Sequence, residues 1–116
     1  MENGLTAALT QGGYYFLTGI WSIISIGTFQ KVTGPKHDLW LVKTVGVILS
    51  VIGAALMVAG SGGELVPSTV VLAVGTAAGL TSVEVIYVKK RIIAPIYLLD
   101  AVAELLFITW WIKNLL

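Results

Sequence analysis

The sequence predicts an all-α membrane protein, an up-down bundle of four transmembrane helices that forms a single domain over residues 1–116. Three observations favour this fold. The chain is 57% hydrophobic and has a mean hydropathy of +0.94. Its seven basic and six acidic residues are too few to give a domain of 116 residues a charged surface. The apolar residues gather in four segments, each near the roughly 20 residues that a helix needs to cross a bilayer.

The four helices are predicted at residues 14–29, 39–59, 67–88 and 95–112, with the first extending back toward Leu5. Pro67 and Pro95 fall in first-turn positions, where the missing N–H costs little. Asp38 is placed to cap the second helix, and the glycine-rich run from Ala59 to Glu64 predicts a turn after it. Strands are not expected, because an open sheet edge cannot be satisfied in lipid.

Basic residues gather at one end of this bundle. Six of them lie in or near the first and third loops: Lys31, Lys36, Lys43, Lys89, Lys90 and Arg91. Lys113 alone lies at the other end. The positive-inside rule then places both termini outside the cytoplasm, and we expect an integral protein of a bacterial inner membrane. The net charge of +1 argues against nucleic acid as a partner, so the lipid bilayer is the expected environment.

The sequence lacks the catalytic residues that most enzyme classes require. The chain has no cysteine, which excludes a thiolate nucleophile and a cysteine metal site, and its one histidine, His37, lies in a predicted loop. No phosphate-binding loop or Ser–His–Asp spacing is present in the sequence. We therefore expect no metal and no cofactor, and an enzyme is the less favoured interpretation.

Acidic residues within the apolar segments are the strongest functional signal. Asp100 and Glu104 are four residues apart, so both carboxylates leave the last helix on one face. Glu104 falls near the membrane midplane, where a lone charge costs at least about 2.5–3.5 kcal/mol. With Glu84 there are three acids, for which Lys43 and Arg91 are the nearest bases. We expect Lys43 to pair with Asp100 or Glu84, and we expect desolvation to favour the protonated form of Glu104.

Polar side chains on the first helix complete the candidate site. They recur at three- and four-residue spacing, at Thr18, Trp21, Ser22, Ser25 and Thr28. Such a stripe either forms hydrogen bonds between helices or lines a wet pocket, and both alternatives stay open. The candidate ligand- or proton-binding residues are Glu104, Asp100, Glu84, Lys43, Trp21, Ser22 and Ser25. Beyond Glu104 the outer half carries aromatic residues rather than charges, which favours a closed outer gate or a one-sided pocket.

Small residues indicate where helices approach closely. Gly46 and Gly53 lie on one seam of the second helix, and Gly75 and Gly79 form a Gly-x-x-x-Gly pair on the third. Small side chains allow close backbone contact in lipid, so all four are predicted helix-packing residues. The Gly75/Gly79 face is left over when Glu84 points inward. We therefore expect it to serve a second copy of the chain in a homodimer.

One stretch resembles a known pattern. The run TGPKHDLWLVKTVG, from Thr33 to Gly46, resembles a pattern in small bacterial four-helix membrane proteins. The resemblance implies a four-helix membrane fold and brings no activity with it. In size and helix count the chain is also similar to small multidrug-resistance transporters and fluoride channels. The former carry their key acid in the first helix, where this chain has none, and its one-sided charges disfavour antiparallel dimers. No functional residue is therefore carried over.

Three hypotheses for function follow from these patterns. In the first, the polar site binds or translocates a proton, a small cation or an amphiphilic ligand. In the second, the chain is an accessory or scaffold subunit of a membrane complex, and its polar core only sets helix packing. In the third, the acid pair performs acid–base chemistry on a lipophilic substrate within the membrane. The first two differ in whether the carboxylates face an open space.

Overall fold

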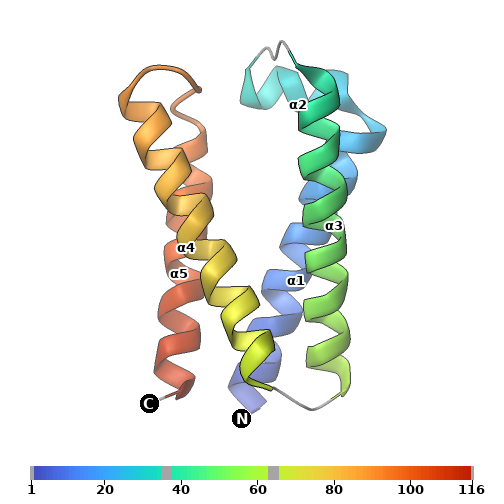
Figure 1. Ribbon diagram of the computed structural model, residues 1–116, viewed down its shortest axis with the longest axis vertical. Coiled ribbons are helices and arrows are strands. Elements are labelled where there is room, and N and C mark those ends of the chain that lie inside the picture. The colour runs from blue at the N-terminus through green and yellow to red at the C-terminus, as the bar shows by residue number, and fades with distance from the viewer. Residues whose placement is uncertain (1, 35–37, 63–65, 116) are drawn as a thin grey trace.

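The computed structural model describes residues 2–34, 38–62 and 66–115, and within these ranges it contains five helices and no strand (Figure 1). The all-α prediction is confirmed. The helices are α1 (Glu2–Ile24), α2 (Ile26–Thr33), α3 (Leu39–Gly62), α4 (Pro67–Lys89) and α5 (Tyr97–Leu115). Among them α3 and α4 are long and apolar enough to cross a membrane. The long helices α1 and α5 fall outside this group, because they carry more polar and acidic residues.

The first predicted helix differs from the observed one at both ends. α1 begins at Glu2, three residues before the predicted extension to Leu5, and the chain leaves the helical conformation at Ser25, where φ is −132° and ψ is 65°. The Ser25 hydroxyl lies 2.7 Å from that of Thr28, on an exposed surface. Hydroxyl side chains that bond locally compete with helical geometry, which accounts for a break inside an otherwise apolar run. The short helix α2 then continues to Thr33.

The other boundaries follow the prediction more closely. Pro67 is at the start of α4, as predicted. The carbonyl of Asp38 accepts hydrogen bonds from the N–H groups of Leu41 and Val42, so Asp38 occupies the predicted cap position of α3. α3 extends to Gly62 rather than residue 59, and Glu64 lies outside the described residues. α5 begins at Tyr97, because Pro95 belongs to a turn in which its carbonyl accepts the N–H of Leu98 at 2.9 Å.

The helices form two antiparallel pairs. α1 packs along α3, and α4 packs along α5 (Figure 1). The pairs meet at the end where α1 begins and α5 ends, chiefly through α1 and α5, and they diverge toward the opposite end. The molecule extends 41 Å along its longest axis, which is close to the ~40–45 Å of a bilayer with its headgroups.

Glycines bring α1 and α3 into backbone contact. A methyl group added at Gly12 would lie 2.6 Å from the Gly53 carbonyl oxygen, and one added at Gly53 would lie 2.5 Å from that of Gly12. Gly19 and Gly46 face each other in the same way, and Gly60 meets the first turns of α1. These glycines recur every seven residues on each helix, the period that keeps a seam facing its partner. Gly46 and Gly53 therefore pack as predicted.

The two glycines of α4 behave differently. A methyl group at Gly75 or Gly79 would have no atom within 4 Å, and both residues are exposed. Neither glycine packs against another helix of the described chain. α4 turns Ala73, Ala77 and Glu84 inward instead, which leaves the glycine face open. The homodimer on that face stays a prediction.

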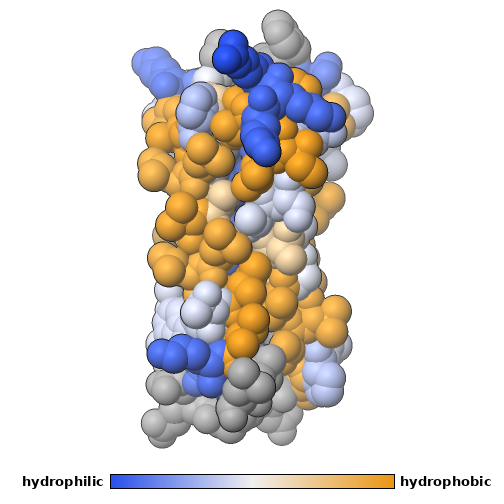
Figure 2. Space-filling model, turned by 90° about the vertical axis from the view of Figure 1, so that its left-hand side faces the viewer, coloured by the Kyte–Doolittle hydropathy of each residue, from blue (hydrophilic) through white to orange (hydrophobic). Residues whose placement is uncertain are grey.

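The outer surface is apolar along most of the long axis. Figure 2 shows hydrophobic side chains between hydrophilic ends on the face formed by α4 and α5. The exposed large apolar residues of these two helices include Val71, Val83, Ile86, Leu98, Leu99, Val102, Leu105, Leu106 and Ile112. Monomeric soluble proteins rarely expose continuous apolar surface on this scale, so the surface favours a membrane environment.

Candidate functional site

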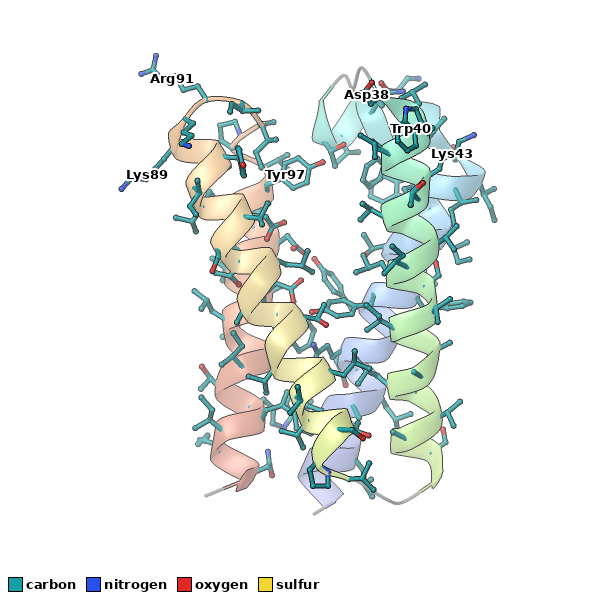
Figure 3. All side chains as sticks on the ribbon, in the orientation of Figure 1. Asp38, Trp40, Lys43, Lys89, Arg91 and Tyr97 are labelled. Atoms are coloured by element: carbon teal, nitrogen blue, oxygen red, sulfur yellow. The ribbon has the colours of Figure 1, made fainter. Side chains whose placement is uncertain are left out.

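A pocket of about 540 Å³ lies between the two helix pairs. All five helices contribute to its wall. The lining residues include Tyr14, Tyr15, Thr18, Trp21, Ser22, Phe29, Leu41, Val45, Gly46, Leu49, Leu80, Glu84, Tyr97, Asp100 and Glu104. The pocket runs from the end where the pairs diverge to the middle of the molecule. Tyr97 lies at its wide end and points from α5 toward the α2–α3 side (Figure 3).

The three acids lie at the inner part of this pocket. Asp100 and Glu104 are one turn apart on α5, and Glu84 reaches the same space from α4. Glu104 is completely buried, Glu84 is 7% exposed and Asp100 is partly buried. Helical spacing explains this convergence, because residues at i and i+4 share a face and that face of α5 turns toward α1 and α4. Sequence reasoning predicted the inward direction of these carboxylates from the cost of exposing them to lipid.

Two tyrosines of α1 donate hydrogen bonds to the acids of α5. The Tyr14 hydroxyl donates to Asp100 Oδ1, and the Tyr15 hydroxyl donates to Glu104 Oε1 at 2.5 Å. The Tyr14 ring also contacts Phe107 on α5, with 5.7 Å between ring centroids. The α1–α3 pair thus holds the carboxylates of α5, which belongs to the other pair.

Gln11 connects the polar groups between Glu104 and the end where α1 begins. Its amide nitrogen donates to the Tyr15 hydroxyl at 3.1 Å and to the Ala73 carbonyl at 2.9 Å. Its amide oxygen accepts the indole N–H of Trp111 at 2.7 Å. Because the Tyr15 oxygen accepts from Gln11, the Tyr15 proton is directed at Glu104. Gln11 and Trp111 are buried, and together with Ala73 they close the molecule between the pocket and the end where the chain begins.

The carboxylates keep unused hydrogen-bonding capacity. Glu104 Oε2 and Glu84 Oε1 are buried and have no hydrogen-bond partner among the described residues. Tyr15 holds the other oxygen of Glu104, and Asp100 lies within hydrogen-bonding reach of both Glu84 and Glu104, so these carboxyls can share a proton. A buried polar atom without a partner costs about 1–3 kcal/mol, more for a charge, so the arrangement favours a proton or a ligand at these oxygens.

Lys43 does not balance these acids, which corrects the prediction. Its side chain is exposed and points away from the pocket on the outer side of α3 (Figure 3). Lys43 lies near the start of α3, where a long side chain reaches the polar end of the molecule more readily than the interior. Arg91 is likewise exposed and points outward. In residues 2–34, 38–62 and 66–115, no ion pair joins a base to Glu84, Asp100 or Glu104.

The predicted hydroxyl stripe divides into two parts. Trp21 and Ser22 line the pocket, where Trp21 packs edge-on against Phe29 with 5.1 Å between ring centroids. Ser22 is buried and donates to the Gly19 carbonyl at 2.9 Å. Ser25 does not line the pocket, because it sits at the break between α1 and α2 and its hydroxyl pairs with that of Thr28. Lys36 and His37 lie outside the described residues.

Sequence reasoning missed Gln11, Tyr15 and Trp111 as parts of the site. The first helix was expected to extend back toward Leu5 and so included Gln11, but neither Gln11 nor the aromatic residues of the outer half were assigned to the polar site. A usable signal was present: Gln11, Tyr15 and Ser22 share one helical face with Thr18. Polar side chains at that spacing in an apolar helix indicate a buried network as readily as an interface.

The chemistry available in the pocket is that of a cavity with three carboxyl groups and apolar walls. Among the described residues, no group of three or more His, Cys, Asp and Glu side chains is arranged to hold a metal ion. The carboxylates can instead accept protons or pair with one charged group of a larger molecule. Comparison of the chain with models of known protein families, with curated proteins and with solved structures finds no match.

Proposed function

We propose that this protein is a small multi-pass membrane protein that binds, and translocates or exchanges, a proton, a small cation or an amphiphilic ligand in its acidic pocket. One observation carries the proposal. Glu104 is completely buried, lines a pocket of about 540 Å³ and leaves Oε2 without a partner in the part of the chain that the structure describes. A carboxylate in that position requires a positive charge or a proton to be stable.

Four membrane spans are part of the proposal. α1 and α5 carry Gln11, Tyr15 and two acids on their facing sides, where Gln11, Tyr15 and one oxygen of Glu104 are joined by hydrogen bonds inside the bundle. Their outward sides remain apolar, at Leu17 and Ile24 on α1 and at Leu105 and Leu106 on α5. α5 has 19 residues, about 28 Å of helix, close to the ~30 Å of a hydrocarbon core.

The pocket is proposed to face the cytoplasm. Its wide end lies at the end of the molecule that carries Lys43, Lys89 and Arg91 (Figure 3). The positive-inside rule assigns that end to the cytoplasmic side of a bacterial inner membrane. The opposite end is closed by Trp111 and Gln11, so ligand reaches Glu104 from one side in this conformation.

The alternative of an accessory subunit with a purely structural polar core explains Gln11, Tyr15 and Trp111. Gln11, Tyr15 and Trp111 use their donors and acceptors fully, as a structural network does. Glu84 and Glu104 do not. A purely structural network does not need the pocket of about 540 Å³ that these two acids line, and that pocket supports a binding site.

Proton flux in proteoliposomes tests the proposal. We expect an imposed pH gradient to drive protein-dependent flux that Glu104→Gln largely abolishes while it leaves the fold intact. Asp38→Asn is the matched control, because it removes an exposed carboxylate at the same end of the molecule but outside the pocket. Equal flux in the wild type, Glu104→Gln and empty liposomes would support the accessory-subunit alternative instead.

A further inference from the structure

We infer that the ligand of this pocket is a lipophilic amine in its protonated form, a molecule with one ammonium group and an apolar, preferably aromatic, body. This inference rests on the proposed function and names the ligand class of the same site. It is carried by three properties of the pocket: its charge, its division into a polar and an apolar part, and its size.

The charge of the pocket selects a cation. Glu84, Asp100 and Glu104 line it, and no lysine, arginine or histidine among the described residues does. Two of their oxygens, Glu84 Oε1 and Glu104 Oε2, are buried without a partner. An ammonium group has several N–H donors and can satisfy such oxygens with charge-assisted hydrogen bonds. An anionic ligand would instead meet like charges in a desolvated site.

The arrangement of the carboxylates favours an organic cation over a metal ion. They are not placed so that three of them could hold one ion, as far as the described residues go. From α1, Tyr14 holds Asp100 and Tyr15 holds Glu104, and Asp100 itself lies within hydrogen-bonding reach of both Glu84 and Glu104. One ammonium group needs only one or two carboxylate oxygens, and that demand matches the free oxygens of Glu84 and Glu104.

The rest of the wall suits an apolar body. Toward the wide end the pocket is lined by Trp21, Phe29, Leu41, Val45, Leu49 and Leu80. Trp21 and Phe29 meet edge to face there and offer aromatic surface to a ring. A volume of about 540 Å³ falls within the ~300–1,000 Å³ of small-molecule sites. The ammonium group is therefore placed at Glu104 and Glu84, and the body along α1, α2 and α3.

Binding of three compounds with one shared body tests the inference. 4-Phenylbutylamine is cationic at neutral pH, 4-phenylbutanol is neutral and 4-phenylbutyrate is anionic. We expect equilibrium dialysis with the full chain in detergent micelles to show saturable binding of the amine, at least about tenfold tighter than that of the alcohol, and no protein-dependent binding of the acid. Glu104→Gln should weaken amine binding at least about tenfold, and Asp38→Asn should leave it unchanged.

The outcomes separate the two proposals. If Glu104→Gln abolishes proton flux but the amine binds no more tightly than the alcohol, the ligand class is wrong and the proposed function stands. If the amine binds equally well to the wild type and to Glu104→Gln, the site is not the one inferred. If flux and amine binding are both absent, both proposals fail. Should Glu104→Gln misfold, Trp21→Ala replaces it, because loss of aromatic wall should weaken amine and alcohol alike.

Discussion

Gln11 satisfies three neighbours with a single amide. It gives two hydrogen bonds, to Tyr15 and Ala73, and accepts one from Trp111, so it joins α1 to both helices of the other pair. Each partner is buried, and none could turn to water if the amide were lost. At the scale of single residues, this amide sets the direction of the Tyr15 proton, and that proton in turn orients the Glu104 carboxyl.

Gln11→Leu should lower the free energy of unfolding by about 1–3 kcal/mol, because it leaves the Trp111 N–H buried without a partner, whereas the Ala73 carbonyl keeps its helical bond within α4. Trp111→Phe in the same chain removes that orphaned N–H, so the double variant should lose less than the two single losses added together. Unfolding in mixed micelles measures both. Strictly additive losses would show that Gln11 and Trp111 do not interact.

The direction of a side chain could be predicted where it depends on the periodicity of a single helix. The spacing of Asp100 and Glu104 places both on one face, and the cost of a charge in lipid turns that face inward. The prediction failed for Lys43, because the side of α3 that faces α1 is set by Gly46 and Gly53, and a lysine near a helix end can avoid the interior. The Tyr15–Glu104 pair requires knowing that α1 lies beside α5, which single-helix periodicity does not contain.

At the scale of helices, the two pairs are built differently. α1 and α3 touch through their backbones at glycines spaced seven residues apart, whereas α4 shows its Gly75/Gly79 face to the outside. The glycine seam was predictable on α3 from spacing alone. The break at Ser25 and the turn at Pro95 were not, because local hydroxyl bonding and turn geometry compete there with an uninterrupted apolar pattern.

Gly53→Ala should destabilise the protein by about 1–3 kcal/mol, since the added methyl would lie 2.5 Å from the Gly12 carbonyl oxygen and the backbones must separate. Gly75→Ala is the matched control. It adds the same methyl where no atom lies within 4 Å, so stability should stay unchanged or rise by up to about 1 kcal/mol through helix propensity. Unfolding in mixed micelles compares the two. Equal effects would contradict the close α1–α3 contact.

At the scale of the whole molecule, the end that carries Lys89, Lys90 and Arg91 lies opposite the end where α1 begins and α5 ends (Figure 1). The sequence predicted this polarity from the distribution of basic residues. It could not predict that the two helix pairs diverge, because that depends on how the pairs contact each other. The acids of the pocket could therefore be predicted from the sequence, but the pocket itself could not, because it forms only when the two pairs pack together.

Alkaline phosphatase fused at Leu116 should be active, because the proposed four spans and orientation would place the C-terminus outside the cytoplasm with the N-terminus. The same reporter inserted after Arg91 should be inactive, and green fluorescent protein should give the opposite pattern at both positions. The insertion at Arg91 controls for expression in an identical membrane context. Active phosphatase at Arg91 and inactive phosphatase at Leu116 would reverse the proposed orientation.

The glycine seam has a mechanical consequence. Two helices in backbone contact along their length slide or bend against each other with difficulty, so α1 and α3 should move as one rigid body. The hydrogen bonds between this body and α4–α5 come from Gln11, Tyr14 and Tyr15 on α1. If one helix pair rotated against the other, these hydrogen bonds would have to stretch or break, and the Tyr15 bond ends on Glu104 itself. A positive charge bound at Glu104 would compete with the Tyr15 hydroxyl for the carboxylate, and so would weaken a bond that joins the two helix pairs.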